Sequence, residues 1–227
     1  MTIQVKGLRK KYFNKEAVKG VDFTIEPQSI IGLLGRNGAG KSTVLNMIAR
    51  RIEKTSGDIT LDGVDLHKTP RAMHQVYLSS TENWFPKEYK FKDLLSIYKK
   101  TYPEFDSEFA EELIKVFGVN VKERFSKAST GYQSIMKIIL ALCNPSEYIF
   151  MDEPVLGLDA NHRHIFNKKL LEAYARNPRT FVIATHLIEE VASILEKVIV
   201  IKDGVVTEEV MVEEVLGKGY VVSGATS

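Results

Sequence analysis

Four short runs of apolar residues along the chain predict buried strands. Three of them end in turn or polar residues, and the fourth is closed by the dipeptide Asp203-Gly204. Runs that are almost continuously β-branched and aliphatic are typical of a parallel sheet that is covered on both faces. The predicted strands are Ile30–Leu34, Tyr148–Met151, Thr180–Ala184 and Lys197–Ile201.

Stretches with helical periodicity lie between and around these strands. Their apolar residues recur at spacings of three and four, which places them on one face of a helix. Strands that alternate with helices predict an α/β fold. The predicted helices are Lys41–Lys54, Phe91–Tyr102, Asp106–Phe117, Tyr132–Cys143, His162–Arg176 and Ile188–Glu196.

Two regions depart from this alternation. Residues 1–28 and about 57–66 have the pattern of short, half-exposed strands, with a hairpin turn at Asp62-Gly63. They predict a small antiparallel sheet beside the main one. Residues from about 85 to 140 predict helices without a convincing strand, with breaks at Pro86, Pro103 and Gly131. This stretch is a helical insertion.

The last residues predict a terminal strand and a short helix over Val205–Val215, and Tyr220–Val222 has the pattern of one more strand. The chain stops at Ser227, soon after that run begins. We therefore expect either a short tail or a truncated C-terminal extension that starts at about residue 216.

The composition is that of a globular protein. Of the 227 residues, 44% are hydrophobic and 26% are charged, which argues against disorder. A formal net charge of +2 gives no basic footprint for nucleic acid. The single cysteine, Cys143, excludes an intramolecular disulfide, and its apolar neighbours predict a buried thiol rather than a nucleophile.

No stretch approaches the ~20 consecutive apolar residues that cross a bilayer. The first eleven residues alternate polar and apolar side chains and contain no hydrophobic core of a secretory signal. We therefore expect a cytoplasmic protein, whose role at a membrane depends on a partner.

A glycine-rich loop follows the first predicted core strand and matches the pattern G-x4-G-K-[ST]. Strand, loop and helix are the setting in which backbone N–H groups surround phosphate oxygens, helped by the positive end of the helix. Lys41 is predicted to reach the β- and γ-phosphates, and the Ser42 hydroxyl to bind Mg²⁺. The predicted nucleotide-binding residues of this loop are Gly35, Asn37, Gly38, Ala39, Gly40, Lys41, Ser42 and Thr43.

Two carboxylates end the apolar strand that begins at Tyr148. Neighbouring side chains of a strand point in different directions, so Asp152 and Glu153 can hold different roles. Asp152 suits Mg²⁺, and Glu153 suits the water that attacks the γ-phosphate. Asp152 lies 111 residues after Lys41, and the helical insertion fills much of this interval. In a small-molecule kinase we expect the second carboxylate sooner.

With these motifs in this order, the chain resembles the ATP-binding cassette ATPases, the nucleotide-binding subunits of ABC transporters. The resemblance covers about residues 2–210. It implies a P-loop NTPase core with a parallel sheet, a small N-terminal antiparallel β-subdomain and an inserted helical subdomain. All of these would form one ABC ATPase domain over residues 1–227.

The resemblance implies further roles for matching residues. The stretch 128–132 matches the family's signature partly, and Ser129 and Gly131 are expected to bind the γ-phosphate of ATP that another subunit holds. Asp159 matches the loop that lies along the dimer interface in the family. His186, after a core strand, is similar to the switch histidine that contacts the γ-phosphate. Ala128, Thr130 and Tyr132 depart from the signature.

Two other family positions leave alternatives open. Tyr12 occupies the place of the aromatic residue that stacks on adenine, with Phe13 as the alternative. Where the family usually has a glutamine after an apolar strand, the run Val76–Ser79 leads to Ser80, which is too short for the same reach. Glu82 is the other residue that could replace the glutamine.

A dense aromatic run begins at Trp84, the single tryptophan of the chain, and also contains Phe85, Tyr89 and Phe91. In the family this region forms a groove for a short helix of the membrane subunit, and large aromatics suit such an interface. The alternative is that the aromatics fill the core of the helical subdomain, and we expect a mixture of the two.

The expected function is therefore Mg²⁺-dependent ATP hydrolysis that powers transport. The partners implied by the resemblance are separate membrane subunits and a second cassette, in a homodimer or a heterodimer, at the cytoplasmic face of the membrane. The loose signature resembles cassettes of bacterial exporters, which favours export over import. The alternatives are a non-transport ABC ATPase acting on ribosomes or DNA, and a kinase of small molecules; no nucleic-acid partner is expected.

Overall fold

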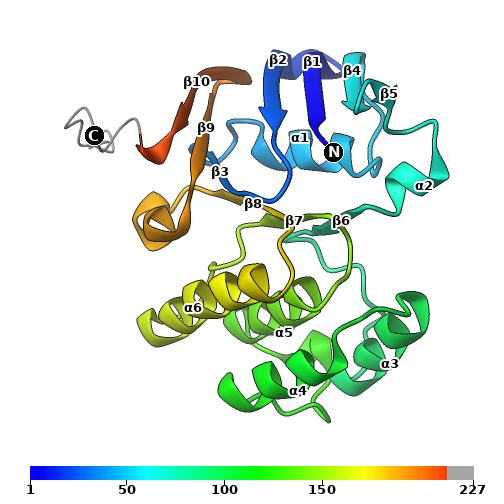
Figure 1. The fold of residues 1–227 in the computed structure, drawn as a ribbon, viewed down its shortest axis with the longest axis vertical. Coiled ribbons are helices and arrows are strands. Elements are labelled where there is room, and N and C mark those ends of the chain that lie inside the picture. The colour runs from blue at the N-terminus through cyan, green and yellow to red at the C-terminus, as the bar shows by residue number, and fades with distance from the viewer. Residues whose placement is uncertain (214–227) are drawn as a thin grey trace.

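The computed structural model describes residues 1–213, and the possible extension from about 216 and the predicted strand Tyr220–Val222 lie outside the described residues. Two sheets form the framework (Figure 1). The smaller sheet is antiparallel and contains β2, β1, β4 and β5 in that order. Its strands are β1 (Ile3–Tyr12), β2 (Lys15–Ile25), β4 (Ser56–Leu61) and β5 (Val64–Asp65). The predicted turn at Asp62-Gly63 joins the last two strands, so this part of the prediction is confirmed.

The larger sheet has the order β10-β9-β3-β8-β7-β6. Five of its strands run parallel, and β10 (Val205–Met211) pairs antiparallel with β9. The predicted parallel sheet is confirmed with this antiparallel edge added. Its parallel strands are β3 (Ile30–Leu34), β6 (Val76–Ser79), β7 (Tyr148–Asp152), β8 (Thr180–Thr185) and β9 (Lys197–Lys202).

Alternating side chains of the large sheet fill two cores. Ile31 and Leu33 of β3 pack with α1 (Lys41–Ile48) and the apolar face of the small sheet, so α1 lies between the two sheets. Ile30 belongs instead to the core on the opposite face, beneath α5 (Thr130–Leu142) and α6 (Ala160–Arg176). Both faces of the large sheet are therefore covered, as its nearly unbroken apolar strands require.

The predicted helical insertion is confirmed between β6 and the end of α5. It contains α3 (Phe91–Thr101), α4 (Ser107–Val116), the 3₁₀ turn η1 (Phe125–Lys127) and α5. These helices gather at the end of the molecule that lies away from the small sheet (Figure 1). The short helix α2 (Pro70–Met73) lies before β6.

Two predicted helices differ from the structure. The helix expected over Lys41–Lys54 ends at Ile48, because the chain turns back there and the N–H groups of Arg51 and Ile52 both donate to the carbonyl of Asn46. The helix expected over Ile188–Glu196 is instead two 3₁₀ turns, η2 (Ile188–Glu190) and η3 (Ala192–Ile194). This short connection crosses β3 from β8 to β9, and Leu195 packs closely against Gly32.

Within residues 1–213, the helices are all too short or too polar to cross a bilayer.

Candidate functional site

A cavity of ≈ 500 Å³ opens at the ends of the central strands, beside the start of α1. The carboxyl ends of parallel strands are where ligands bind in open α/β sheets. Many residues that the sequence singled out line this cavity: Tyr12, residues 37–43, Glu153 and His186. Lys15, Ala17, Thr81 and Leu156 also line it and were not predicted.

Two glycines of the loop lie where another stretch of backbone comes so close that a side chain would not fit. Gly40 has φ +111°, a conformation that L side chains rarely adopt, and a Cβ there would lie 2.9 Å from the carbonyl oxygen of Ala17. A Cβ at Gly35 would lie 2.2 Å from the carbonyl oxygen of Ile201. Gly35 does not line the cavity. Because it has no side chain, the loop can pass close to β9 where it follows β3.

Lys41 is the first residue of α1, and its side chain is only 5% exposed. Its Nζ donates to the carbonyl of Gly35 over 2.6 Å and lies 3.4 Å from Oε1 of Glu153. The loop thus places a nearly buried cation opposite the carboxylate of the catalytic candidate.

Glu153 is held by the strand beside its own. It has φ +49°, and its N–H donates to the carbonyl of Ala184 over 2.7 Å. Thr185 Oγ1 donates to Oε2 of Glu153 and His186 Nδ1 donates to Oε1, both over 2.9 Å. Burial raises the pKa of Glu153, but these hydrogen bonds and the charge of Lys41 more than offset it, so the pKa is lowered. The carboxylate is therefore ionised at neutral pH.

Asp152 lies one residue earlier, at the end of β7, and is buried. Its Oδ1 has no hydrogen-bond partner. Burial raises the pKa of this carboxyl, and a hydrogen bond with Ser42 partly opposes the shift. A buried carboxylate oxygen without a partner, next to a serine hydroxyl, fits a hard divalent cation such as Mg²⁺.

Ser129, Gly131 and Asp159 lie outside the cavity. Ser129 is the N-cap of α5, and its Oγ accepts from the N–H of Tyr132. Asp159 is the N-cap of α6 and accepts from the N–H of His162 over 2.8 Å. A Cβ at Gly131 would lie 2.2 Å from the carbonyl oxygen of Gly157, so the start of α5 touches the loop that leads to α6. Within one chain, these three residues are not brought to the phosphate loop.

The hairpin between β1 and β2 separates the two candidates for adenine stacking. Tyr12 lines the cavity, whereas Phe13 is 99% exposed at the hairpin turn. Tyr12 pairs with Lys15 across the hairpin, which explains why Lys15 also lines the cavity. The register of this hairpin is the signal that could have identified Lys15.

The loop after β6 contributes Thr81 to the cavity, between the two residues that the sequence proposed. Ser80 is buried, and its Oγ lies 3.4 Å from the carbonyl oxygen of Glu82. Neither Ser80 nor Glu82 lines the cavity.

The aromatic run divides between surface and core. Trp84 is 71% exposed, whereas Phe91 is fully buried. Phe85 packs edge-on against Phe125, with ring centroids 4.9 Å apart.

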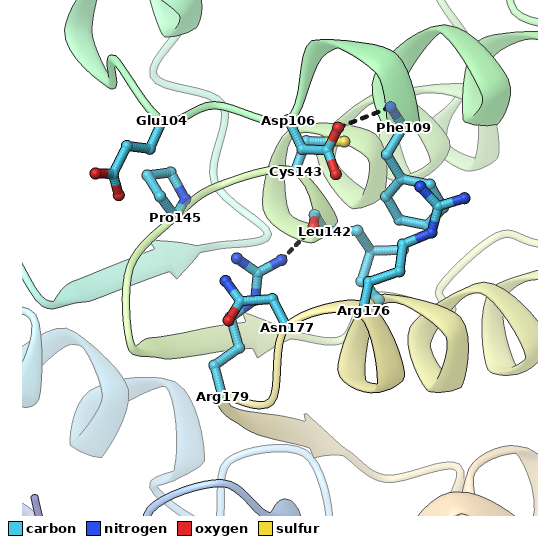
Figure 2. A pocket seen from close by; sticks show the side chains of 10 residues that line it. Glu104, Asp106, Phe109, Leu142, Cys143, Pro145, Arg176, Asn177 and Arg179 are labelled. Carbon is cyan, nitrogen blue, oxygen red and sulfur yellow. Dashed lines mark hydrogen bonds between the residues drawn. The ribbon is translucent and has the colours of Figure 1, made fainter.

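A second cavity of ≈ 230 Å³ lies among the C-terminal ends of α5 and α6 and the start of α4, and contains none of the predicted site residues (Figure 2). The buried Arg179 guanidinium lies there and donates to the carbonyl of Leu142 over 2.5 Å and to that of Asn144. Arg179 therefore caps the end of α5. Cys143 is buried as predicted, and burial raises the pKa of its thiol.

The family described as "ABC transporter" matches residues 18–156, which include the phosphate loop, the start of α5 and both carboxylates. The chain belongs to the ABC transporter family. The ABC transporter ATP-binding protein YtrB of Bacillus subtilis (strain 168) is 30% identical over 212 residues, which are 93% of this chain and 73% of YtrB. NatA of the same organism, also described as an ABC transporter ATP-binding protein, is 33% identical over 83% of this chain and 79% of its own length.

Solved ABC ATPase structures share the fold. The structure of an ATP-binding subunit of an ABC transporter has a TM-score of 0.82 at 21% identity, over 96% of this chain and 93% of the other. A second is the dimeric structure of MJ0796, a bacterial ABC transporter cassette, with a TM-score of 0.78 at 23% identity. It covers 92% of this chain and 98% of that one. The chain is thus an α/β ATP-binding cassette with the P-loop NTPase fold.

Proposed function

We propose that this cassette binds ATP with Mg²⁺ in the ≈ 500 Å³ cavity and hydrolyses the γ-phosphate bond. The observation that carries the proposal is the convergence of Lys41, Glu153 and His186 on one cavity wall with the phosphate loop. Its family membership supports the same activity. We propose further that residues 1–227 form a single ABC ATPase domain.

The residues at this site would have separate roles. The backbone of residues 35–43 and the ammonium of Lys41 would hold the phosphates, and Tyr12 would stack on the adenine ring. Ser42 and Asp152 would hold Mg²⁺, which supplies positive charge to the phosphate oxygens when it is bound. Glu153, ionised and fixed by Thr185, would accept the proton of the attacking water. His186 would contact the γ-phosphate and orient the Glu153 carboxylate.

We propose that the active form is a dimer, with either an identical chain or a homologous one. Ser129 and Gly131 would bind the γ-phosphate of ATP held by the other subunit, and Asp159 would lie along the interface. They do not line the cavity beside the phosphate loop of their own chain, which supports a role toward a nucleotide held by the other subunit. The dimeric form of the MJ0796 cassette supports it as well.

We also propose that the cassette works at the cytoplasmic face of a membrane by docking to separate membrane subunits, with export as the direction of transport. The exposed Trp84 gives the helical subdomain an aromatic contact of the kind that interfaces favour. Family membership supports a transport role over action on ribosomes or DNA.

The test is hydrolysis of ATP by the purified chain with Mg²⁺, followed by phosphate release and analysis of products. We expect free phosphate and ADP without any phosphorylated acceptor. A phosphorylated small molecule would instead identify a kinase. Purification from membranes tests the transport role, because integral membrane chains should accompany the cassette, whereas ribosomes or DNA would contradict it.

A further inference from the structure

One lysine of α5 holds the backbone that follows β6 by hydrogen bonds. Lys137 Nζ donates to three consecutive carbonyls, those of Ser80 over 2.8 Å, Thr81 over 2.9 Å and Glu82 over 3.1 Å. An ammonium has three N–H donors, so this contact uses all of them. The lysine and the loop are more than fifty residues apart in sequence, so the contact is tertiary.

This lysine is not a solvated surface residue. Its side chain is half-buried, and Nζ lies 5.9 Å from the centre of the Phe125 ring. Burial and the nearby charge of Arg51 lower the pKa of Lys137 to about 8, while Asp152 and Glu82 oppose this shift. The carbonyl oxygens stabilise this half-buried ammonium, because water does not hydrate it fully.

The loop held by Lys137, residues 80–82, is part of the wall of the ATP cavity. Thr81 lines that cavity, and Ser80 bridges back to the Glu82 carbonyl within the same turn. A second contact joins α5 to the wall, because Ser134 Oγ donates to the carbonyl of Leu156 over 2.9 Å, and Leu156 also lines the cavity. One helix is therefore fastened to the cavity at two points.

The same helix begins at Ser129, eight residues before Lys137. At 1.5 Å per residue, about 12 Å of rigid helix separates them. A displacement of the loop at Thr81 is thus carried to the N-terminus of α5 without passing through a flexible segment.

We propose that Lys137 is a positioning residue that ties the cavity wall at Thr81 to α5, so that the loop and the Ser129 end of the helix move as one unit. The proposal rests on the proposed ATPase function. It assigns the hold on this loop to a lysine of the helical subdomain.

The test compares Lys137→Met, which removes the donors but keeps a long side chain, with Lys137→Arg, which keeps charged donors. Lys168→Met is the matched control, because Lys168 is an exposed lysine of α6. Trp84 lies two residues beyond the loop and is the single tryptophan, so its fluorescence anisotropy reports the mobility of the loop. Hydrolysis is followed by kcat and by KM for ATP.

We expect Lys137→Met to lower the anisotropy of Trp84 without nucleotide and to reduce kcat roughly tenfold to hundredfold, since small misplacements cost that much. The KM for ATP should change far less, because the phosphate loop is untouched. Lys137→Arg should restore both quantities, and Lys168→Met should match the wild type. If Lys137→Met fails to fold, Lys137→Gln, which has two neutral donors in place of three charged ones, replaces it, and a smaller change in the same direction is expected.

Wild-type anisotropy and wild-type kcat in the Met or Gln variant would overturn the proposal. A loss of kcat in the Met variant that Arg does not restore would also overturn it. An inactive wild-type protein would refute the ATPase function instead, and the anisotropy of the nucleotide-free variants would still test the hold on the loop.

Discussion

A methyl group on the α-carbon of Gly131 would lie 2.2 Å from the carbonyl oxygen of Gly157. Gly157 itself has φ +76°, and a Cβ there would lie 2.9 Å from the backbone nitrogen of Gly131. The two glycines thus let the start of α5 and the loop before α6 touch through backbone alone. In this way Ser129 is set against the segment that connects Glu153 with Asp159.

Replacing Gly131 by alanine tests this contact. The new methyl group has only backbone to displace, so we expect a loss of about 1–3 kcal/mol in the free energy of unfolding, measured by denaturant titration. ATP hydrolysis should fall as well. Thr130→Ala, one residue earlier and exposed, is the control for stability and should stay within about 0.5 kcal/mol of wild type. Equal stability of the two variants would contradict the close approach.

Glu153→Gln removes the proton acceptor but keeps the size of the side chain. We expect turnover to fall below detection, while ATP binding and ATP-dependent dimerisation persist, since the phosphate loop is unchanged. Phosphate release and size-exclusion chromatography with MgATP measure the two effects. The exposed Glu147, just before β7, gives the control Glu147→Gln, which should hydrolyse ATP normally. Wild-type turnover in Glu153→Gln would remove the assignment.

Asp152→Asn should stabilise the protein when Mg²⁺ is removed by chelation. The pKa of Asp152 is raised above its ordinary 3.8, so the folded state binds this proton more tightly than the unfolded chain. The carboxyl therefore costs stability as pH rises through the interval between 3.8 and its folded pKa.

The free energy of unfolding of Asp152→Asn should exceed that of wild type by about 1–3 kcal/mol at neutral pH, with no difference at acid pH. Adding Mg²⁺ and ATP should stabilise wild type more than the variant. Denaturant titrations at several pH values, with and without chelator, measure both effects. A variant that gains as much as wild type from Mg²⁺ would contradict the assignment of Asp152.

Tyr12→Ala and Phe13→Ala are a matched pair. Tyr12 lines the cavity and Phe13 extends into solvent, so the first substitution alone should weaken ATP binding. Loss of one aromatic stacking contact predicts roughly a two- to twelvefold rise in Kd. Isothermal titration calorimetry on the Glu153→Gln background, where ATP is not consumed, measures the difference. A larger effect at Phe13 would reverse the assignment.

Arg179→Met should destabilise the protein, because the carbonyls of Leu142 and Asn144 lose a buried charged donor. We expect a loss of about 1–3 kcal/mol in the free energy of unfolding. Arg176 and Arg179 both line the cavity of ≈ 230 Å³ (Figure 2). The ion pairs of Arg176 with Glu112 and Glu172 are half-exposed, however. Arg176→Met should therefore cost less than about 1 kcal/mol. The reverse order of the two losses would contradict the capping role of Arg179.

The elements that the sequence predicted well are those with a strong local signal. The strand before Gly35 and the strand that ends at Asp152 are runs of mainly apolar residues. Gly38 and Gly40 indicate a loop whose backbone adopts positive φ. Those local patterns were sufficient to bring Lys41 and Glu153 together, because parallel strands end at one edge of the sheet.

What the sequence did not predict depends on tertiary contacts. No sequence motif singles out Thr81 or Leu156, and only their place in the cavity distinguishes them from their neighbours. Lys137 stands among the apolar residues of α5 as one ordinary lysine, and its meaning comes from three carbonyls in a distant loop. The end of the first helix at Ile48 was missed for a similar reason, since Asn46 gathers the following backbone N–H groups.

The order of the large sheet has a consequence for how the nascent chain matures. The strand that leads into the phosphate loop, β3, is hydrogen-bonded to β8 on one side and to β9 on the other. Both neighbours come much later in the sequence, at Thr180–Thr185 and Lys197–Lys202, so this early strand has no partners until those residues have been synthesised. During translation its backbone N–H and C=O groups stay unpaired and its apolar side chains stay uncovered, which makes this segment prone to aggregation.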